Sequence, residues 1–352
     1  MPISGEKQVL VTGGAGYIGS HMVMQLLRAG RMVCVIDDLS TGHAESIDRL
    51  QREFPRERLR FVRGSILDGD LVTRVLQDGG IDEVLHFAGR ALVGESMERP
   101  LEYWQVNLGG TISLLRAMHS AGATRLVFSS TCATYGSPSA ASIPIGESCD
   151  QRPINPYGAS KLACERAILD DAAAPGSTLA VAILRYFNVI GSDPRGFVGE
   201  DHTPETHIVP ACLRAASGAA DEFVMMGTDY STPDGTCIRD YVNVNDLCEA
   251  HMAALGAVVR GAPLTLNVGT GRGHSVRDIV EACERVVGRA IPQRMGARRA
   301  GDPPTLVADP ARITSTLPWR ARTVALDESV AQTWRWMQAN PRGYATDARS
   351  NL

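Results

Sequence analysis

Tyr157 and Lys161 are the two residues whose types and spacing point most directly to chemistry. They stand four residues apart at the start of an apolar-periodic stretch through Leu162 and Ile168, which predicts a helix with both side chains on one face. An ammonium beside a phenol favours the phenolate and lowers the phenol's pKa from its ordinary value of about 10. Only two of the 35 cationic residues are lysines, so this position has the rarer of the two cations. The pair predicts a tyrosine general base tuned by a lysine.

A run of hydroxyl side chains ends an apolar segment upstream of this pair. Ser129, Ser130 and Thr131 follow the apolar residues 126–128, which predict a strand. Hydroxyls at the end of such a strand could complete a proton path to Tyr157. The alternative is a purely structural one, because serine and threonine commonly end strands and cap helices.

Gly13, Gly16 and Gly19 are spaced three apart, directly after the apolar run 9–11 and before the apolar-periodic segment 21–29. A glycine turn between a strand and a helix lets a pyrophosphate approach the positive end of the helix dipole. The spacing therefore predicts a dinucleotide site, and a glycine-rich packing turn is the alternative.

A second β-rich run, 32–36, ends in Asp37 and Asp38 and completes a strand-helix-strand unit. A carboxylate in this place can accept hydrogen bonds from a ribose diol, whereas it would repel a 2′-phosphate. NAD is thus favoured over NADP. The alternative for this acidic pair is a solvated turn.

Further apolar runs alternate with segments that could be helical, and this order predicts a Rossmann-like, doubly wound parallel sheet in an α/β protein. After residue 188 the chain becomes rich in Gly, Pro, Asp and His, which indicates a smaller, mixed α/β substrate lobe. We expect a dinucleotide-binding domain over 1–187 with a returning segment near 241–270, a second lobe over 188–345 and a loosely held tail over 346–352.

Charge and composition exclude several classes of protein. A net charge of −4 leaves no cationic excess for a nucleic-acid backbone or an anionic membrane. No stretch reaches the roughly 18 uninterrupted apolar residues of a membrane span, and the first eight residues lack a signal-type apolar run, so we expect a cytoplasmic protein. The eight cysteines contain no CxxC pair and are expected to be reduced. His202 and His207 lie near acidic residues, but no metal site is expected there.

The glycine turn, Ser130 with Thr131, and the Tyr157–Lys161 pair together resemble the extended short-chain dehydrogenase/reductase superfamily. Additional segments make the chain similar to its UDP-glucose 4-epimerase family over about residues 9–345. These segments are 11–21, 86–89, 93–96, 100–103, 185–188, 199–202, 204–207, 230–241 and 299–302.

The resemblance implies that Thr131 and Tyr157 flank the sugar 4-hydroxyl, while Lys161 binds the nicotinamide ribose and tunes Tyr157. It implies NAD as cofactor. The cofactor would be bordered by Gly13, Gly16, Tyr17, Ile18, Gly19, Asp37, Asp38, Ser65, Ile66, Phe87, Ala88, Asn107, Tyr157, Lys161 and Tyr186.

The second lobe would bind the UDP-sugar. The implied contacts, besides Thr131, are Asn188, His207, Ile208, Val224, Met226, Arg239, Arg299, Asp302 and Leu306. Two arginines suit a diphosphate because each offers a planar fork of donors. The implied reaction is the reversible 4-epimerisation of UDP-glucose and UDP-galactose through a bound 4-keto sugar.

Several alternatives remain. Epimerases of N-acetylated hexosamines keep a small residue at the place of Leu306, so the leucine favours an unmodified hexose, and a pentose is a further alternative. Dehydratases on the same scaffold place an Asp-Glu pair where this chain has Cys132 and Ala133. An NAD-sensing protein without catalysis is the alternative from another class.

Members of the family often form homodimers through two helices. The segment 101–119 and the helix after Tyr157 carry apolar residues that could form such a seam. An ordinary core face is the alternative, and a homodimer is the expectation.

Overall fold

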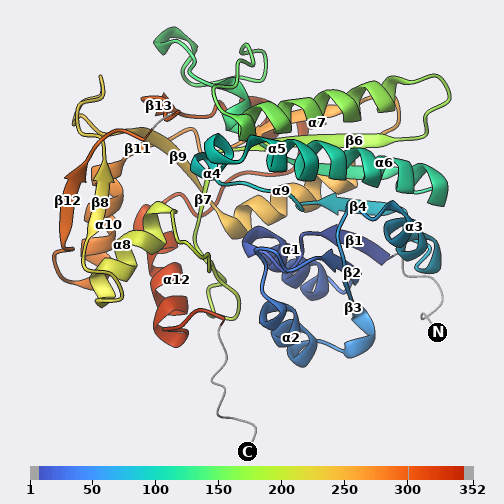
Figure 1. Ribbon diagram of the computed structural model, residues 1–352, viewed down its shortest axis with the longest axis horizontal. Helices are drawn as coiled ribbons and strands as arrows, with labels where there is room; N and C mark the ends of the chain where they lie inside the picture. The colour runs from blue at the N-terminus through green and yellow to red at the C-terminus, as the bar shows by residue number, and fades with distance from the viewer. Residues whose placement is uncertain (1–7, 300, 345–352) are drawn as a thin grey trace, which may run out of the picture.

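The structure, a computed structural model, describes residues 8–299 and 301–344 and has a seven-stranded parallel sheet at its centre (Figure 1). The strand order is β3-β2-β1-β4-β5-β6-β10. The bounds are β1 (Gln8–Thr12), β2 (Met32–Asp37), β3 (Leu59–Arg63), β4 (Glu83–His86), β5 (Arg125–Thr131), β6 (Ala180–Tyr186) and β10 (Leu264–Val268). The order reverses between β1 and β4, which opens a crevice at the carboxyl ends of these strands. The prediction of a doubly wound α/β sheet is confirmed.

Alternation along each strand supplies two separate apolar cores, one on each face of the sheet. In β1, Val9 and Val11 belong to one core and Leu10 to the other, and this buried part of the strand is therefore a continuous apolar run. The helices α1 (Tyr17–Arg28), α2 (Ala44–Glu53) and α9 (Val244–Ala257) cover the first core. The second is covered by α3 (Gly69–Asp78), α6 (Gly110–Ala121) and α7 (Pro156–Ala173).

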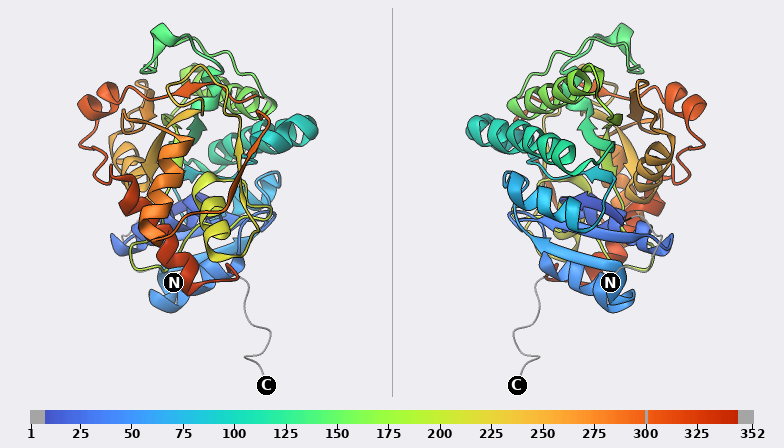
Figure 2. Two further views of the ribbon diagram at one scale, coloured as in Figure 1. Left: turned by 90° about the vertical axis from the view of Figure 1, so that its left-hand side faces the viewer. Right: turned by 90° about the vertical axis from the view of Figure 1, so that its right-hand side faces the viewer.

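A second lobe, at the left of Figure 1 and facing the viewer in the left panel of Figure 2, packs around its own apolar core. Its helices are α8 (Ile208–Ser217), α10 (Val276–Val287) and α12 (Leu326–Ala339). Two small sheets join β7 (Asn188–Ile190), β9 (Ile238–Asn243), β11 (Gly273–Ser275) and β13 (Thr305–Leu306), and β8 (Phe223–Met226) with β12 (Gln293–Gly296). The helix α11 (Ala311–Thr316) packs on the first core of the main sheet.

The segment predicted as one helix over 101–119 consists of three pieces. A π-helical segment, Trp104–Gly109, separates α5 (Pro100–Tyr103) from α6, and the short helix α4 (Val93–Glu98) precedes them. Asn107 lies in the π-helical segment, and its amide bonds the backbone of Arg90 and the Ser160 hydroxyl. Such bulges often accompany functional sites.

Three short 3₁₀ turns complete the described elements: Arg56–Arg58, Cys132–Tyr135 and Ala140–Ser142. Within the described residues, no helix has the length and apolar content needed to cross a membrane. The tail predicted for residues 346–352 lies outside the part of the chain that the structure describes.

Candidate active site

One cleft of about 550 Å³ runs from the carboxyl edge of the main sheet to the second lobe. Its volume is within the range of pockets that bind cofactors and small molecules. The cleft is lined by all the predicted site residues except Asn107 and Lys161, which are buried. The predicted residues that line it are Gly13, Gly16, Tyr17, Ile18, Gly19, Asp37, Asp38, Ser65, Ile66, Phe87, Ala88, Thr131, Tyr157, Tyr186, Asn188, His207, Ile208, Val224, Met226, Arg239, Arg299, Asp302 and Leu306.

The glycine turn joins β1 to α1 at one end of this cleft. Gly13 has a φ of +72°, and a Cβ there would lie 2.6 Å from the backbone nitrogen of Ala88. A Cβ on Gly19 would lie only 2.0 Å from the carbonyl oxygen of Gly13. Gly16, at the N-terminus of α1, has no neighbour closer than 3.5 Å to such a Cβ. Gly13 and Gly19 therefore permit the tight turn, while Gly16 leaves open space for a phosphate at the helix terminus.

Asp37 ends β2 beside the glycine turn, as a ribose-binding carboxylate should. One of its oxygens accepts a hydrogen bond from Ala15 N at 2.9 Å and the other from Leu39 N at 2.8 Å. Burial raises the pKa of Asp37, and these two N–H donors oppose that shift. Each carboxylate oxygen can accept a further hydrogen bond, so a ribose diol has acceptors available. The turn and the carboxylate together fit the adenosine half of NAD.

Tyr157 and Thr131 face each other across the reaction end of the cleft. Tyr157 lies in the first turn of α7, and Thr131 is the last residue of β5. The two are 8% and 6% exposed. Burial raises the pKa of Tyr157 above its ordinary value, and a hydrogen bond with Thr131 partly offsets this. The sequence predicted that the pKa of the Tyr157 phenol is lowered. With only the protein's own side chains around it, the pKa is raised, so this prediction is wrong for the protein without its cofactor.

Lys161 explains this difference by its position. Its Nζ donates to the Ser129 carbonyl oxygen at 2.9 Å and lies 4.7 Å from the centre of the Phe128 ring. Lys161 is not among the groups that shift the Tyr157 pKa most, and burial lowers its own pKa. A Cβ on Gly89 would lie 3.5 Å from this Nζ, which places the ammonium directly behind the Gly89 wall of the cleft. The Lys161 ammonium thus lies behind Gly89 and is not bonded to the Tyr157 phenol.

The side chains of Ser129, Ser130 and Thr131 point alternately to the two faces of β5. Ser129 and Thr131 share one face of β5, where the Ser129 hydroxyl lies 3.1 Å from His251 Nε2. The Ser130 hydroxyl points to the opposite face and donates to the Glu165 carboxylate, so it takes no part in a path to the cleft.

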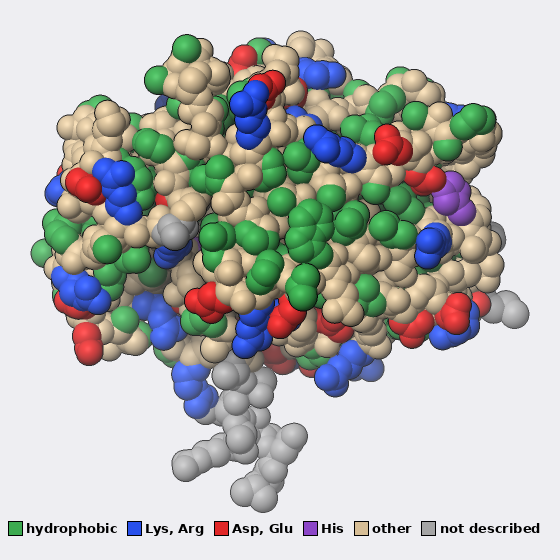
Figure 3. Space-filling view, turned by 45° about the horizontal axis from the view of Figure 1, so that its top comes forward, with side chains coloured by type: hydrophobic (Ala, Val, Ile, Leu, Met, Phe, Trp, Pro, Cys, Tyr) green, Lys and Arg blue, Asp and Glu red, His purple; other side chains and the backbone are tan. Residues whose placement is uncertain are grey.

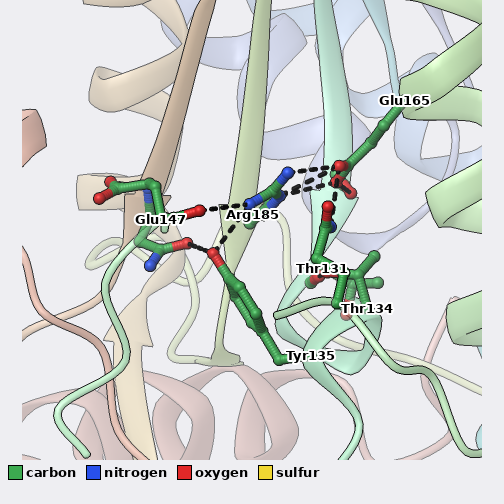
Figure 4. A network of polar contacts seen from close by, with 9 residues as sticks. Thr131, Thr134, Tyr135, Glu147, Glu165 and Arg185 are labelled. Carbon is green, nitrogen blue, oxygen red and sulfur yellow. Dashed lines mark hydrogen bonds and ion pairs between the residues drawn. The ribbon is translucent and has the colours of Figure 1, made fainter. Parts of the chain in front are cut away.

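Glu165 belongs to a buried polar network behind Thr131 (Figure 4). It pairs with Arg185 at 2.7 Å, and Arg185 donates to the Tyr135 hydroxyl at 3.0 Å. The side chains of Glu165 and Arg185 are 1% and 6% exposed. Because residues on both sides of Thr131 are tied to this network, the network fixes the end of β5 on which Thr131 stands.

The other end of the cleft offers cations and an apolar wall. Arg239, in β9, is 8% exposed and lies 3.7 Å from the Asp302 carboxylate, whereas Arg299 is exposed. Cys132, Phe187 and Leu306 line the cleft and belong to one apolar cluster. This end of the cleft thus combines charged groups of the second lobe with an apolar wall to which both parts of the chain contribute.

Sequence reasoning missed several lining residues. Asn155 lines the cleft and caps α7, since its Oδ1 accepts a hydrogen bond from Gly158 N at 2.8 Å. The Asn-Pro pair before Tyr157 was an available signal for this helix start. Glu200 and His202 also line the cleft, and their contribution depends on a loop conformation that no local pattern predicts.

Comparison with known proteins agrees with this geometry. The NAD dependent epimerase/dehydratase family matches residues 9–269. A UDP-glucose 4-epimerase of Lactobacillus helveticus is 43% identical over 338 residues, covering 96% of this chain and 99% of that protein. A probable UDP-arabinose 4-epimerase of Oryza sativa subsp. japonica is 44% identical over 348 residues, covering 97% of this chain and 85% of that protein.

Two solved structures share the whole fold. A UDP-glucose 4-epimerase from Stenotrophomonas maltophila, with bound NAD and formylated UDP-arabinopyranose, has a TM-score of 0.90 at 38% identity, covering 96% of this chain and 99% of that one. A UDP-glucose 4-epimerase from Brucella ovis, in complex with NAD, has a TM-score of 0.85 at 44% identity. The match covers 94% of this chain and 98% of that one. The chain therefore belongs to the NAD dependent epimerase/dehydratase family and is an NAD-dependent isomerase.

Proposed function

We propose that the protein interconverts UDP-glucose and UDP-galactose by inverting C4 of the sugar. The observation that carries this proposal is the single cleft in which Thr131 and Tyr157 stand between the Gly13–Gly19 turn and the arginines of the second lobe. In this proposal residues 1–187 hold NAD and residues 188–345 hold the UDP-sugar.

Tyr157 is the proposed base for the sugar 4-hydroxyl proton. Its phenol lines the cleft, and the Thr131 side chain beside it lowers the phenol's pKa, which favours the phenolate. Thr131 would also orient the sugar hydroxyl towards the phenol. In the second half of the reaction Tyr157 would return the proton to the oxygen on C4, while hydride returns to the opposite face of C4.

The cofactor is proposed to lie along the glycine turn and Asp37, with its nicotinamide near Tyr157. Bound NAD supplies the acceptance and return of hydride at C4. Lys161 lies behind Gly89 and is placed to hold the nicotinamide ribose. Its ammonium has three N–H donors, of which one bonds the Ser129 carbonyl oxygen and the others remain for the ribose.

Inversion requires that the bound 4-keto sugar turn over while its UDP stays in place. Arg239 and Arg299 are the proposed anchors for the diphosphate, because guanidinium forks match phosphate oxygens. Phe187, Leu306 and Cys132 offer the sugar an apolar wall. Charged contacts to the diphosphate would hold UDP in place, while the apolar wall would let the hexose turn. This combination supports epimerisation.

The experiment is to incubate the purified protein with UDP-galactose, without added NAD, and to follow the sugar nucleotide by proton NMR. UDP-glucose is expected to form until the two reach equilibrium. If the protein retains its cofactor and no UDP-glucose forms, the proposal is wrong.

A UDP-pentose is the second candidate substrate, and the likeness to UDP-arabinose 4-epimerases of Oryza sativa and Arabidopsis thaliana supports it. A pentose lacks the hydroxymethyl group of a hexose and would fit the same cleft. Comparing kcat/KM for UDP-galactose and UDP-arabinose decides between them, and UDP-GlcNAc tests whether Leu306 excludes an N-acetyl group.

Dehydration is disfavoured by the residues after Thr131. Cys132 is 7% exposed, and burial raises the pKa of its thiol to about 12. Such a thiol is a poor acid or base near neutral pH, and Ala133 has no proton to give. No 4-keto-6-deoxy product is therefore expected.

We also propose a homodimer through the face formed by α4 to α7, where Figure 3 shows hydrophobic side chains gathered. Leu101 is 79% exposed, Met97 49% and Trp104 37%, whereas Leu115 and Met118 belong to the core. An apolar face of this kind is typical of an interface. Light scattering at micromolar concentration should give twice the chain mass, and a monomer would overturn this proposal.

A further inference from the structure

Four side chains from the loop between β7 and α8 converge beside the cleft. Glu200, His202, Glu205 and His207 each direct one nitrogen or oxygen atom to a common point, and these four atoms all lie within 4.8 Å of one another. His202 Nδ1 lies 3.5 Å from Glu200 and 3.7 Å from Glu205, while His207 Nδ1 lies 3.1 and 3.3 Å from the same carboxylates. Two imidazoles and two carboxylates are a ligand set typical of a divalent transition metal.

The atoms at the centre of this cluster lack other partners. Glu200 Oε1, His202 Nδ1 and His207 Nδ1 are all buried, and none of them has a hydrogen-bond partner in the structure. The Glu200 side chain is only 1% exposed. A buried carboxylate oxygen without a donor is costly unless a cation or a proton satisfies it. Glu200 Oε1 has only the two imidazole nitrogens near it, so it needs a positive charge there, which a cation bound between the four side chains would supply.

The nitrogen-oxygen separations are close to those between two ligand atoms of one small cation. Zinc bonds to nitrogen and oxygen at about 2.0 to 2.2 Å, so two of its tetrahedral ligand atoms lie about 3.3 to 3.6 Å apart. The four nitrogen-oxygen separations, 3.1 to 3.7 Å, lie around this value, with His202 and His207 each near a different oxygen of Glu205. A cation with two charges would also neutralise the two carboxylates if both imidazoles are neutral.

We propose that Glu200, His202, Glu205 and His207 form a binding site for one divalent transition-metal ion of the zinc type. Four protein ligands close the coordination shell, which is the mark of a structural ion rather than a catalytic one. The backbone N–H of His207 donates to Glu205 Oε1 at 2.8 Å and orients that carboxylate from outside the shell.

The position of the site gives it a structural consequence. The His202 ring packs edge-on against Tyr17 of the glycine turn, with centroids 6.2 Å apart, and His207 leads directly into α8. An ion here would fasten the loop between the cofactor side and the substrate side of the cleft. Because His207 would use Nδ1 for the metal, only its other ring nitrogen would remain for UDP.

Metal binding can be measured without reference to activity. The purified holoenzyme is dialysed against a chelator, shown to keep its NAD, and titrated with ZnCl₂ by calorimetry, with the bound metal counted by mass spectrometry. One equivalent of zinc is expected. Cobalt(II) in its place should give the strong visible absorption of a tetrahedral site, and a weak octahedral spectrum would contradict the proposed geometry.

Two variants and a control assign the ligands. Glu200→Gln and His202→Asn should each weaken zinc binding by more than about 100-fold, since losing a ligand costs more than losing an outer partner. His119→Asn is the control, because His119 is exposed and lies 2.9 Å from a single carboxylate, that of Asp171. If Glu200→Gln fails to fold by circular dichroism, His202→Asn still decides the matter, because that side chain is 22% exposed.

Two results would overturn the proposal. One is the absence of a zinc equivalent in the wild-type protein, which would leave protonated histidines paired with the carboxylates. The other is wild-type zinc affinity in the folded His202→Asn variant. Neither result bears on epimerisation, which the UDP-galactose experiment tests separately.

Discussion

Replacing Tyr157 with phenylalanine removes one oxygen atom and leaves the ring in place. The side chain is 8% exposed, so the ring keeps its packing and the variant creates almost no cavity. Loss of the polar contact with Thr131 should cost no more than about 1 kcal/mol of folding free energy. Loss of a general base should lower kcat by about 10² to 10⁴-fold, which corresponds to about 2.7 to 5.4 kcal/mol in the activation barrier. The expected signature is therefore a large kinetic defect in a folded protein that keeps its NAD.

The assay is the conversion of saturating UDP-galactose, with NAD retention measured after denaturation. Tyr103→Phe is the matched control, because Tyr103 is also buried, its ring centre lies 6.4 Å from that of Tyr157, and its hydroxyl bonds Glu95 at 2.7 Å outside the cleft. This control should keep kcat within about tenfold of the wild type. If Tyr157→Phe retained a tenth of the wild-type kcat or more, another group would have to be the base.

The pH profile gives a second readout for the same variant. A base must be deprotonated to accept a proton, so kcat/KM should rise with pH until the phenol's pKa is passed. Burial shifts this limb towards higher pH, since it raises the pKa of Tyr157. The residual activity of Tyr157→Phe should lack the limb, and an unchanged profile would assign it to a different group.

Four further substitutions test the cofactor turn, the buried network and the sugar wall. Gly19→Ala should destabilise the fold by about 1 to 3 kcal/mol, because the added Cβ meets the Gly13 carbonyl oxygen at 2.0 Å. Gly16→Ala should keep the melting temperature, because its Cβ has no neighbour closer than 3.5 Å, and should lower the affinity for NAD. Equal melting temperatures for the two would contradict this reasoning. Glu165→Gln leaves Arg185 buried without a carboxylate and should cost about 3 to 5 kcal/mol in chemical denaturation, so a cost below about 1 kcal/mol would refute the role of the pair. Leu306→Ser should raise kcat/KM for UDP-GlcNAc relative to UDP-galactose, and an unchanged ratio would remove Leu306 as a selector.

The parallel sheet was predictable because its signals are local. Continuous apolar runs such as 9–11 and 32–36 form strands that are buried on both faces, and the glycine spacing between them is itself a local signal. The positions of Gly13 and Gly19 follow from the same turn, since close backbone approach excludes a Cβ at either.

Other features depend on tertiary contacts that spacing does not encode. A spacing of four put Tyr157 and Lys161 on one helical face, but it could not show that the ammonium would turn to Ser129 O. The π-helical segment at Asn107 interrupts an otherwise regular helical pattern because its amide is used by Arg90 and Ser160. Local periodicity reports which face a residue is on, whereas the orientation of a buried polar group depends on which partners the rest of the chain brings to it.

The raised pKa of Tyr157 and the lowered pKa of Lys161 give the site a directional property. Burial disfavours both the phenolate and the ammonium. Further positive charge near Tyr157 would favour its phenolate, and it would oppose the ammonium of Lys161. An oxidised nicotinamide carries such a charge and a reduced one does not. Tyr157 would therefore give up its proton most readily while the cofactor can still accept hydride, and would hold a proton once it has done so. Proton and hydride would leave the sugar together and return together, which is the coupling that reversible epimerisation requires.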